Sequence, residues 1–280
     1  MNRSAPAPER ITLLISHRYQ FIFLKTHKTA GTSVEVALEH LCAPPGVETG
    51  MHYRDQHVSE AGIIGARGGA AQSADWRNHM SARAIRTKVG RQVWNRYYRF
   101  SIIRNPYDRM VSMFWSRMEK PDRVVLRSAP FATVKSRFHQ WLAAQGTSNN
   151  LNKLTIGPRL CVHYVLRYEH LAEDFADLTS ELEGAPISLP RLKTNRRKRT
   201  EHWRDYYDDQ AKKHVKRSAA FELAFFGYDF DGGPSDLSSG ARARRLATTS
   251  PAHLFAAFQP LQKKAQKIHL NHLDAPLSAP

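Results

Sequence analysis

Residues 19–41 read YQFIFLKTHKTAGTSVEVALEHL, and the spacing of their apolar side chains changes partway along. The first apolar run, Phe21–Leu24, is continuous, which is typical of a parallel strand buried on both faces. After it the apolar residues recur at helical spacing, and Thr32 or Ser33 stands where a helix N-cap is expected. The stretch therefore predicts a strand, a loop and a helix.

The loop between this strand and this helix has the features of a phosphate site. Gly31 allows close approach of the backbone to a ligand, and the first N–H groups of a helix attract an anion. The loop is not a Walker A motif, because GxxxxGK[ST] needs an earlier glycine and a lysine directly before the hydroxyl residue. Here Lys28 precedes the turn and would project toward the far end of a bound phosphate, which suits stabilisation of a leaving group.

Residues 97–105, YYRFSIIRN, predict a second buried strand, and Asn105 with Pro106 predicts the cap and first turn of a following helix. Arg104 at the end of that strand can donate two hydrogen bonds to a phosphate, and Ser112 on the helix can donate one from its hydroxyl. Two such units predict a three-layer α/β fold. A central, mostly parallel sheet would be flanked by helices, with ligand loops at the carboxyl ends of its strands.

Together the two motifs resemble those of sulfotransferases that use 3′-phosphoadenosine 5′-phosphosulfate (PAPS), especially the carbohydrate (heparan and chondroitin) branch. HKTAGTS at 27–33 resembles the 5′-phosphosulfate loop Pro-Lys-Thr-Gly-Gly-Thr-Ser, with His27 in place of proline and Ala30 in place of one glycine. RNPYDRMVS at 104–112 resembles the 3′-phosphate motif RNPxxRxxS. The resemblance covers roughly residues 11–230 and implies a P-loop-like sulfotransferase fold.

The resemblance also implies a role for each motif residue. The residues implied to bind PAPS are Lys28, Thr29, Ala30, Gly31, Thr32 and Ser33 at the 5′-phosphate, and Arg104 and Ser112 at the 3′-phosphate. Lys28 would also neutralise charge on the leaving oxygen. His79, just before a predicted helix that ends at Gly90, matches the histidine that acts as base in the carbohydrate branch; a structural histidine is the competing interpretation. No metal is required, because lysine and helix termini stabilise the charge.

Composition limits the function classes without choosing one. The 280 residues suffice for one large α/β domain, and a net charge of +17 indicates an anionic partner: nucleic acid, acidic polysaccharide, membrane surface or charged nucleotide. The two cysteines, Cys42 and Cys161, form no disulfide framework or metal-ligand cluster and are expected in the core. No apolar run spans a bilayer and no signal peptide is apparent, so we expect a cytoplasmic protein of bacterial type.

The remaining segments give weaker predictions. We expect a loose N-terminus over residues 1–10, a sulfotransferase domain over 11–230, and a linker with an amphipathic helix over 231–280. That helix would contact a membrane surface or a partner, or pack on its own domain. The basic run 191–199 is either a solvated or nonspecific nucleic-acid-binding loop or, by the resemblance, a loop that closes over PAPS. Residues 43–75 are expected to be mostly loop, and 203–226 a helix.

The predicted function is sulfuryl transfer from PAPS to an acceptor hydroxyl, on a glycan or glycolipid, by in-line attack. One alternative is a P-loop-like nucleotide phosphotransferase, which the missing Walker A and B features disfavour. The other is a nonenzymatic nucleic-acid-binding protein, which the absence of a recognised motif and of regular aromatic interleaving disfavours.

Overall fold

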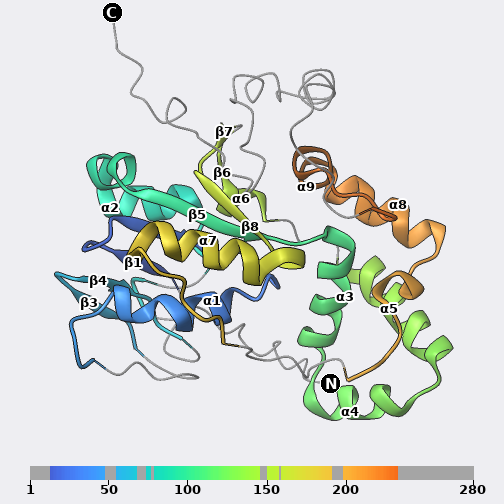
Figure 1. Ribbon diagram of the computed structural model, residues 1–280. Helices are drawn as coiled ribbons and strands as arrows, with labels where there is room; N and C mark the ends of the chain where they lie inside the picture. The colour runs from blue at the N-terminus through green and yellow to red at the C-terminus, as the bar shows by residue number, and fades with distance from the viewer. Residues whose placement is uncertain are drawn as a thin grey trace, which may run out of the picture. The chain divides into compact units, whose positions relative to one another are not determined.

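The computed structural model describes residues 13–47, 55–67, 74–76, 79–145, 150–157, 159–190 and 198–232 (Figure 1). They fall into two compact units. The sheet unit comes from within residues 13–103 and 150–190, and the helical unit from within 104–145 and 198–232. The predictions for residues 1–10, for 233–280 and for most of the basic run lie outside the described residues.

The sheet unit is built on a six-stranded sheet, in the order β3-β4-β1-β2-β5-β8 among the described residues. Its strands are β1 (Leu14–Ser16), β2 (Phe21–Leu24), β3 (His57–Ser59), β4 (Gly62–Ile64), β5 (Tyr98–Ile103) and β8 (Tyr164–Arg167). The neighbours β2, β5 and β8 run parallel, whereas the β1, β3 and β4 pairings are antiparallel. Turns such as residues 17–20 between β1 and β2 are too short for a parallel crossover.

Helices cover both faces of this sheet. On one face, α1 (Gly31–Leu38) and α7 (Leu171–Glu183) bury Val34 and Phe175 in the same apolar core as Phe23 and Phe100 of the strands. Arg99 lies on the opposite face, because successive strand residues alternate, and its guanidinium stacks over Trp94 near the end of α2 (Ala82–Arg96). The predicted three-layer α/β fold is therefore confirmed, although among the described residues two strand pairings of this sheet are parallel and three are antiparallel, so the sheet is mixed. The parallel strands are those that precede the predicted loops, and the antiparallel strands extend the sheet at one edge.

The other elements of the sheet unit are short. They are η1 (Glu39–Leu41), α6 (Leu151–Leu154), β6 (Thr155–Ile156), β7 (Arg159–Leu160) and η3 (Tyr168–His170). Gly90 breaks α2 with a φ of 79°, as the sequence suggested, but helical turns resume beyond it. Residues 43–75, expected to be mostly loop, contain the two three-residue strands β3 and β4. Cys42 and Cys161 are both buried, as predicted.

The helical unit consists of six described helical segments. These are α3 (Pro106–Arg117), α4 (Lys120–Ser128), α5 (Phe131–Gln145), η4 (Trp203–Tyr206), α8 (Asp209–Ser218) and α9 (Ala220–Phe226). Helix α3 begins as predicted, with Asn105 Oδ1 accepting the Tyr107 N–H at 3.0 Å. The single helix predicted over 203–226 is wrong. Asp208 Oδ1 accepts the Ala211 N–H at 2.7 Å and caps a new helix, so the chain breaks there.

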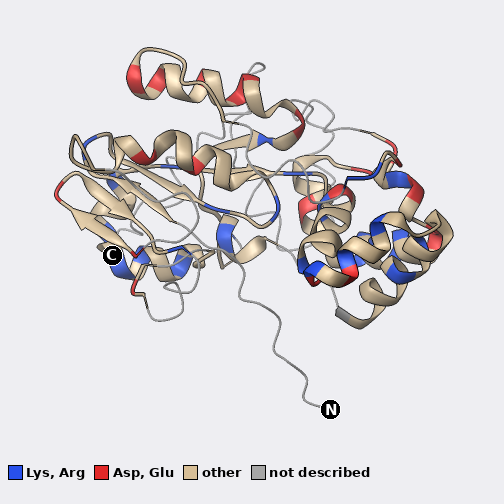
Figure 2. Ribbon diagram, turned by 90° about the horizontal axis from the view of Figure 1, so that it is seen from below, with Lys and Arg blue, Asp and Glu red and all other residues tan. Residues whose placement is uncertain are grey.

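Charge is distributed unevenly over these helices (Figure 2). Helix α7, LAEDFADLTSELE, carries acidic residues and no basic ones, whereas α8 contains lysines and an arginine in its last two turns. The net positive charge is therefore not spread evenly over the elements of the molecule. None of the described helices is long and apolar enough to cross a bilayer.

A buried ion pair connects two helices of the helical unit. Arg109 of α3 is 1% exposed, and its guanidinium makes two contacts with the Glu222 carboxylate of α9, the longer at 3.2 Å. We expect Arg109→Ala to lower the free energy of unfolding by about 3 to 5 kcal/mol, because it removes the guanidinium that faces the buried Glu222 carboxylate. Urea unfolding followed by circular dichroism measures this change.

The control is Arg117→Ala, at an exposed position on the same helix, which we expect to change the free energy of unfolding by less than about 0.5 kcal/mol. The double variant Arg109→Met with Glu222→Leu should recover most of the loss, because it removes both charges. A loss below about 1 kcal/mol for Arg109→Ala would contradict the interpretation.

Candidate active site

The loop after β2 leaves the sheet at a point fixed by side-chain hydrogen bonds. Thr26 Oγ1 donates to the Ile102 carbonyl of β5, and Ser101 Oγ of β5 donates to the Leu24 carbonyl. The hydroxyl oxygens of Thr26 and Thr29 lie 2.8 Å apart, and both residues are buried. The Thr29 hydroxyl is therefore used inside the loop, so that only its backbone is a candidate for binding a ligand.

The backbone of the loop takes a conformation that side chains rarely adopt. Lys28 has a φ of 59° and Ala30 a φ of 60°, both in the left-handed region. Such positions cost about 1 to 3 kcal/mol each and cluster at functional sites. Ala30 stands where the resembling motif has a glycine, the residue to which this conformation is open at no steric cost.

Helix α1 begins at Gly31, and the predicted caps Thr32 and Ser33 are wrong. Ala30 is the N-cap, and it supplies no side-chain hydrogen bond to the helix. Ser33 N–H donates to the Ala30 carbonyl at 2.9 Å, so this amide is used within the turn. The predicted caps lie inside the first turn, since the left-handed Ala30 already turns the chain. The helix start thus has the positive dipole end of an anion site without a capping oxygen.

Lys25, which the sequence analysis did not select, lies directly beneath the loop. It is 7% exposed, and its Nζ donates to Glu35 Oε2 at 2.9 Å and to Thr32 Oγ1 at 3.3 Å. A Cβ added to Gly31 would lie 2.8 Å from Lys25 Cγ and 2.9 Å from its Cε. Gly31 is therefore needed here to make room for the Lys25 side chain.

The Lys25–Glu35 pair belongs to a larger buried network. Arg67 Nη2 contacts Glu35 Oε2 at 3.2 Å and Glu39 Oε1 at 2.7 Å. Two acidic and two basic side chains thus neutralise one another under the start of α1. The charge of Lys25 is therefore offset within this network.

His79 lies beside the loop, half-buried and with a φ of 47°. Its Nδ1–H donates to the Lys25 carbonyl at 3.1 Å, because a carbonyl only accepts, so the lone pair of the neutral ring is on Nε2. Burial lowers the pKa of His79 well below 6.5, and the positive charges of His27, Lys25 and Lys153 lower it further. At neutral pH the ring is uncharged and has a nitrogen able to accept a proton.

The structure brings the two predicted catalytic residues to the same end of the sheet unit. The His79 ring stacks on the His27 ring, with 3.7 Å between ring centroids, and His27 directly precedes Lys28. Lys28 itself is half-buried on the left-handed loop. The structure thus places His79 against the residue that directly precedes Lys28.

Arg104 and Ser112 belong to the helical unit. Arg104 Nε and Nη2 lie 2.8 and 2.7 Å from Asp108 Oδ2 in the first turn of α3, which orients the guanidinium. Ser112 is half-buried on α3. The sequence analysis missed the Asp108 contact, although its spacing, four residues after Arg104, is that of a helical ion pair.

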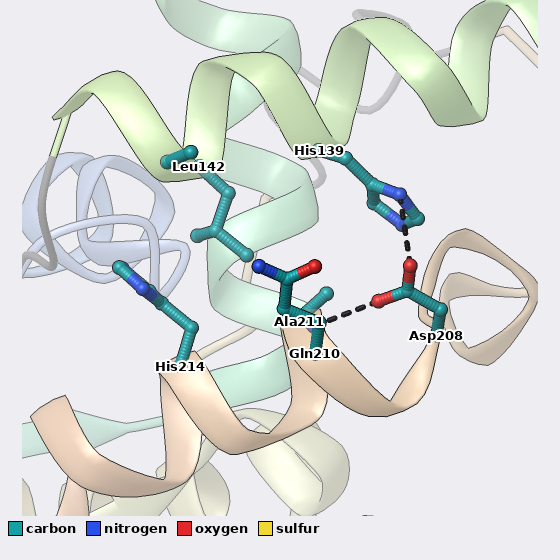
Figure 3. Close-up of a pocket in the computed structure, with 7 residues that line it drawn as sticks. His139, Leu142, Asp208, Gln210, Ala211 and His214 are labelled. Carbon is teal, nitrogen blue, oxygen red and sulfur yellow. Dashed lines mark hydrogen bonds and ion pairs between the residues drawn. The ribbon is translucent and has the colours of Figure 1, made fainter.

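A shallow hollow lies in the helical unit between α5 and α8 (Figure 3). Its volume is about 420 Å³, including the solvent-filled space at its mouth. His139 contacts Asp208 Oδ2 through Nδ1 at 3.3 Å and the Tyr206 carbonyl through Nε2 at 2.8 Å. Asp208 also caps α8. These polar groups join α5 to the start of α8, and none of the predicted site residues lines the hollow. We therefore assign it a structural role.

A mixed sheet whose parallel strand β2 leads into a left-handed loop with a lysine and an uncapped helix start defines an α/β protein with the features of an anion site. The family model described as "Sulfotransferase family" matches residues 12–229, which is most of the chain. The protein therefore belongs to this family. No curated protein and no solved structure matched the chain significantly. Family membership supports sulfuryl transfer to a hydroxyl-bearing acceptor.

Proposed function

We propose that this sulfotransferase uses PAPS as donor and a carbohydrate hydroxyl, on a glycan or glycolipid, as acceptor. The observation that carries the proposal is the neutral His79, with its Nε2 lone pair, beside the loop that bears Lys28. The resemblance of both motifs to the carbohydrate branch supports this choice of donor and acceptor. The net charge of +17 is compatible with a multiply charged donor.

In the proposed reaction His79 Nε2 takes the proton of the acceptor hydroxyl as its oxygen attacks sulfur. The new oxygen–sulfur bond forms while the bond from sulfur to the bridging oxygen of the leaving 3′,5′-bisphosphate breaks. Lys28 neutralises the negative charge that develops on that oxygen. Lysine and the dipole of α1 supply this stabilisation, so the proposal includes no metal.

The donor would be held by two sets of groups. Backbone amides at 29–32, with the hydroxyls of Thr32 and Ser33, would hold the 5′-phosphate, since the Ser33 amide already donates to the Ala30 carbonyl. Arg104 and Ser112 would hold the 3′-phosphate, with the guanidinium oriented by Asp108. The uncapped, left-handed start of α1 fits the first group, because its positive end lacks a side-chain acceptor.

The proposal predicts selective binding of the 3′,5′-bisphosphate product. We expect Arg104→Ala to weaken that binding by about 1.5 to 3 kcal/mol, the scale of a hydrogen bond to a charged group. Adenosine 5′-phosphosulfate, which lacks the 3′-phosphate, should bind the variant and the wild type about equally. Isothermal titration calorimetry on the full chain measures both ligands.

Arg104→Lys is the matched control. We expect an intermediate loss of bisphosphate affinity, because lysine keeps the positive charge but lacks the planar guanidinium. ATP also lacks the 3′-phosphate and should bind more weakly than the bisphosphate. If ATP binds as tightly, or if the protein turns over ATP with magnesium, the nucleotide phosphotransferase would replace the present proposal.

A further inference from the structure

Two histidines from separate parts of the sequence lie face to face in the sheet unit. The ring centroids of His27 and His79 are 3.7 Å apart and the ring planes differ by 24°. His27 is on the loop after β2, and His79 lies shortly before α2. The resembling loop motif has proline where this chain has His27, and proline offers no aromatic ring and no charge. The pair is therefore a feature of this chain's own loop.

The position of His27 is fixed independently of His79. Its backbone N–H donates to Asn150 Oδ1 at 2.9 Å, and Asn150 is 2% exposed. The Asn150 carbonyl in turn accepts the Lys153 N–H at 2.9 Å at the start of α6. His27 thus presents its ring from an anchored backbone, and His79 is held on a second side by the Lys25 carbonyl.

We propose that His27 is a positioning residue for His79, which it holds by ring stacking in the orientation set by the Lys25 carbonyl and keeps uncharged. This inference rests on the proposed function, in which His79 is the base. The stack fixes the plane of the His79 ring, and the hydrogen bond at Nδ1 fixes its rotation. The Nε2 lone pair then points in one direction without needing the acceptor to order it.

The charged groups around His79 also favour its neutral form. Protonating both rings of a stacked pair would bring two positive charges close together, which costs energy. The other charged groups that act on His79 are Lys25 and Lys153, which are also cationic. Burial and all three neighbours oppose protonation, and only the hydrogen bond to the Lys25 carbonyl favours it. His79 therefore stays a competent base in mildly acidic solution, and His27 contributes to that range.

The first test follows the protonation of His79 directly and needs no acceptor. The full chain is labelled with ¹³C-histidine, and the His79 Cε1–H resonance is assigned by its loss in His79→Gln. In the wild type this resonance should report a mostly neutral ring at pH 6. In His27→Ala and His27→Phe the protonated fraction at pH 6 should rise measurably above that of the wild type, because one group that opposes protonation is gone. Burial, Lys25 and Lys153 should keep it below the roughly three quarters of an ordinary imidazole.

The second test separates stacking from charge. At pH 8, with an acceptor found by screening glycans and glycolipids with labelled PAPS, His27→Phe should keep kcat within about twofold because it preserves the stack. His27→Ala should lose about three- to tenfold at the same pH through misplacement of the base. Between pH 8 and pH 6, kcat/KM of both variants should fall up to about fourfold further than that of the wild type.

Unchanged titration of His79 in both His27 variants would overturn the inference, and unchanged kcat at pH 8 in His27→Ala would overturn the stacking role. These outcomes are distinct from failure of the proposed function. If His79→Ala keeps normal turnover while the resonance still shifts in the His27 variants, the base assignment fails and the coupling between the rings stands. If His27→Ala does not fold, His27→Phe gives the same titration test.

Discussion

His79→Ala is expected to lower kcat by about 10²- to 10⁴-fold with the natural acceptor, the range for loss of a general base. Affinity for the 3′,5′-bisphosphate should stay nearly unchanged. The physical reason is that the variant removes the Nε2 lone pair, which is available at neutral pH because burial and neighbouring cations lower the pKa of His79. Initial rates of transfer from labelled PAPS and calorimetric titration with the bisphosphate measure the two effects.

The pH dependence adds a check on this role. Raising the pH, or supplying a more acidic phenolic acceptor, should recover part of the lost rate, because the acceptor proton then leaves without a base. His40→Ala is the matched control, since His40 lies on η1 of the same sheet unit and its side chain is 59% exposed. Near-normal turnover of His79→Ala would show that the base is elsewhere, with His52 and His57 the next to test.

Lys28→Ala is expected to lower kcat by about 10²- to 10³-fold, by analogy with loss of an oxyanion donor. The slow hydrolysis of PAPS in the absence of acceptor should fall as well, because the same oxygen leaves in both reactions. Lysine and alanine both carry a Cβ, so the strained backbone at a φ of 59° is equally strained in the variant. The rate at which the 3′,5′-bisphosphate forms, measured with and without acceptor, tests the prediction.

The contrast between the two variants gives the sharper result. His79→Ala should slow transfer far more than acceptor-independent hydrolysis, whereas Lys28→Ala should slow both. Lys88→Ala is the control for a change of net charge, because Lys88 is a partly exposed lysine of α2 that pairs with Asp75. Hydrolysis unaffected by Lys28→Ala would remove the lysine from the leaving-group side of the reaction.

The parts of the fold that depend on local periodicity could be predicted from the sequence. The continuous apolar run of β2 and the helical spacing of α1 identify a strand–loop–helix unit, and the Asn105–Pro106 pair marks the start of α3. Because buried parallel strands have this pattern, the three-layer class followed. The short strands β3 and β4, with three residues each, carry too little periodicity to be distinguished from loop.

Only those parts of the candidate site that lie within a single sequence motif could be predicted. The loop and its lysine follow from residues adjacent in sequence, whereas the His27–His79 stack joins positions 52 residues apart. The capping role of Ala30 was missed because alanine gives no signal for a left-handed conformation. The break at Asp208, which caps α8, was missed because residues 203–226 were expected to form one continuous helix.

The neutral network of Lys25, Glu35, Arg67 and Glu39 has a consequence for the evolution of this loop. Its members come from the loop, from α1 and η1, and from the segment after β4, yet each balances the charge of another. Loss of Arg67 alone would leave an excess of negative charge in the core. Tolerated substitutions should therefore occur in compensating pairs. The four positions should therefore covary among homologues even though none of them belongs to the 27–33 motif itself.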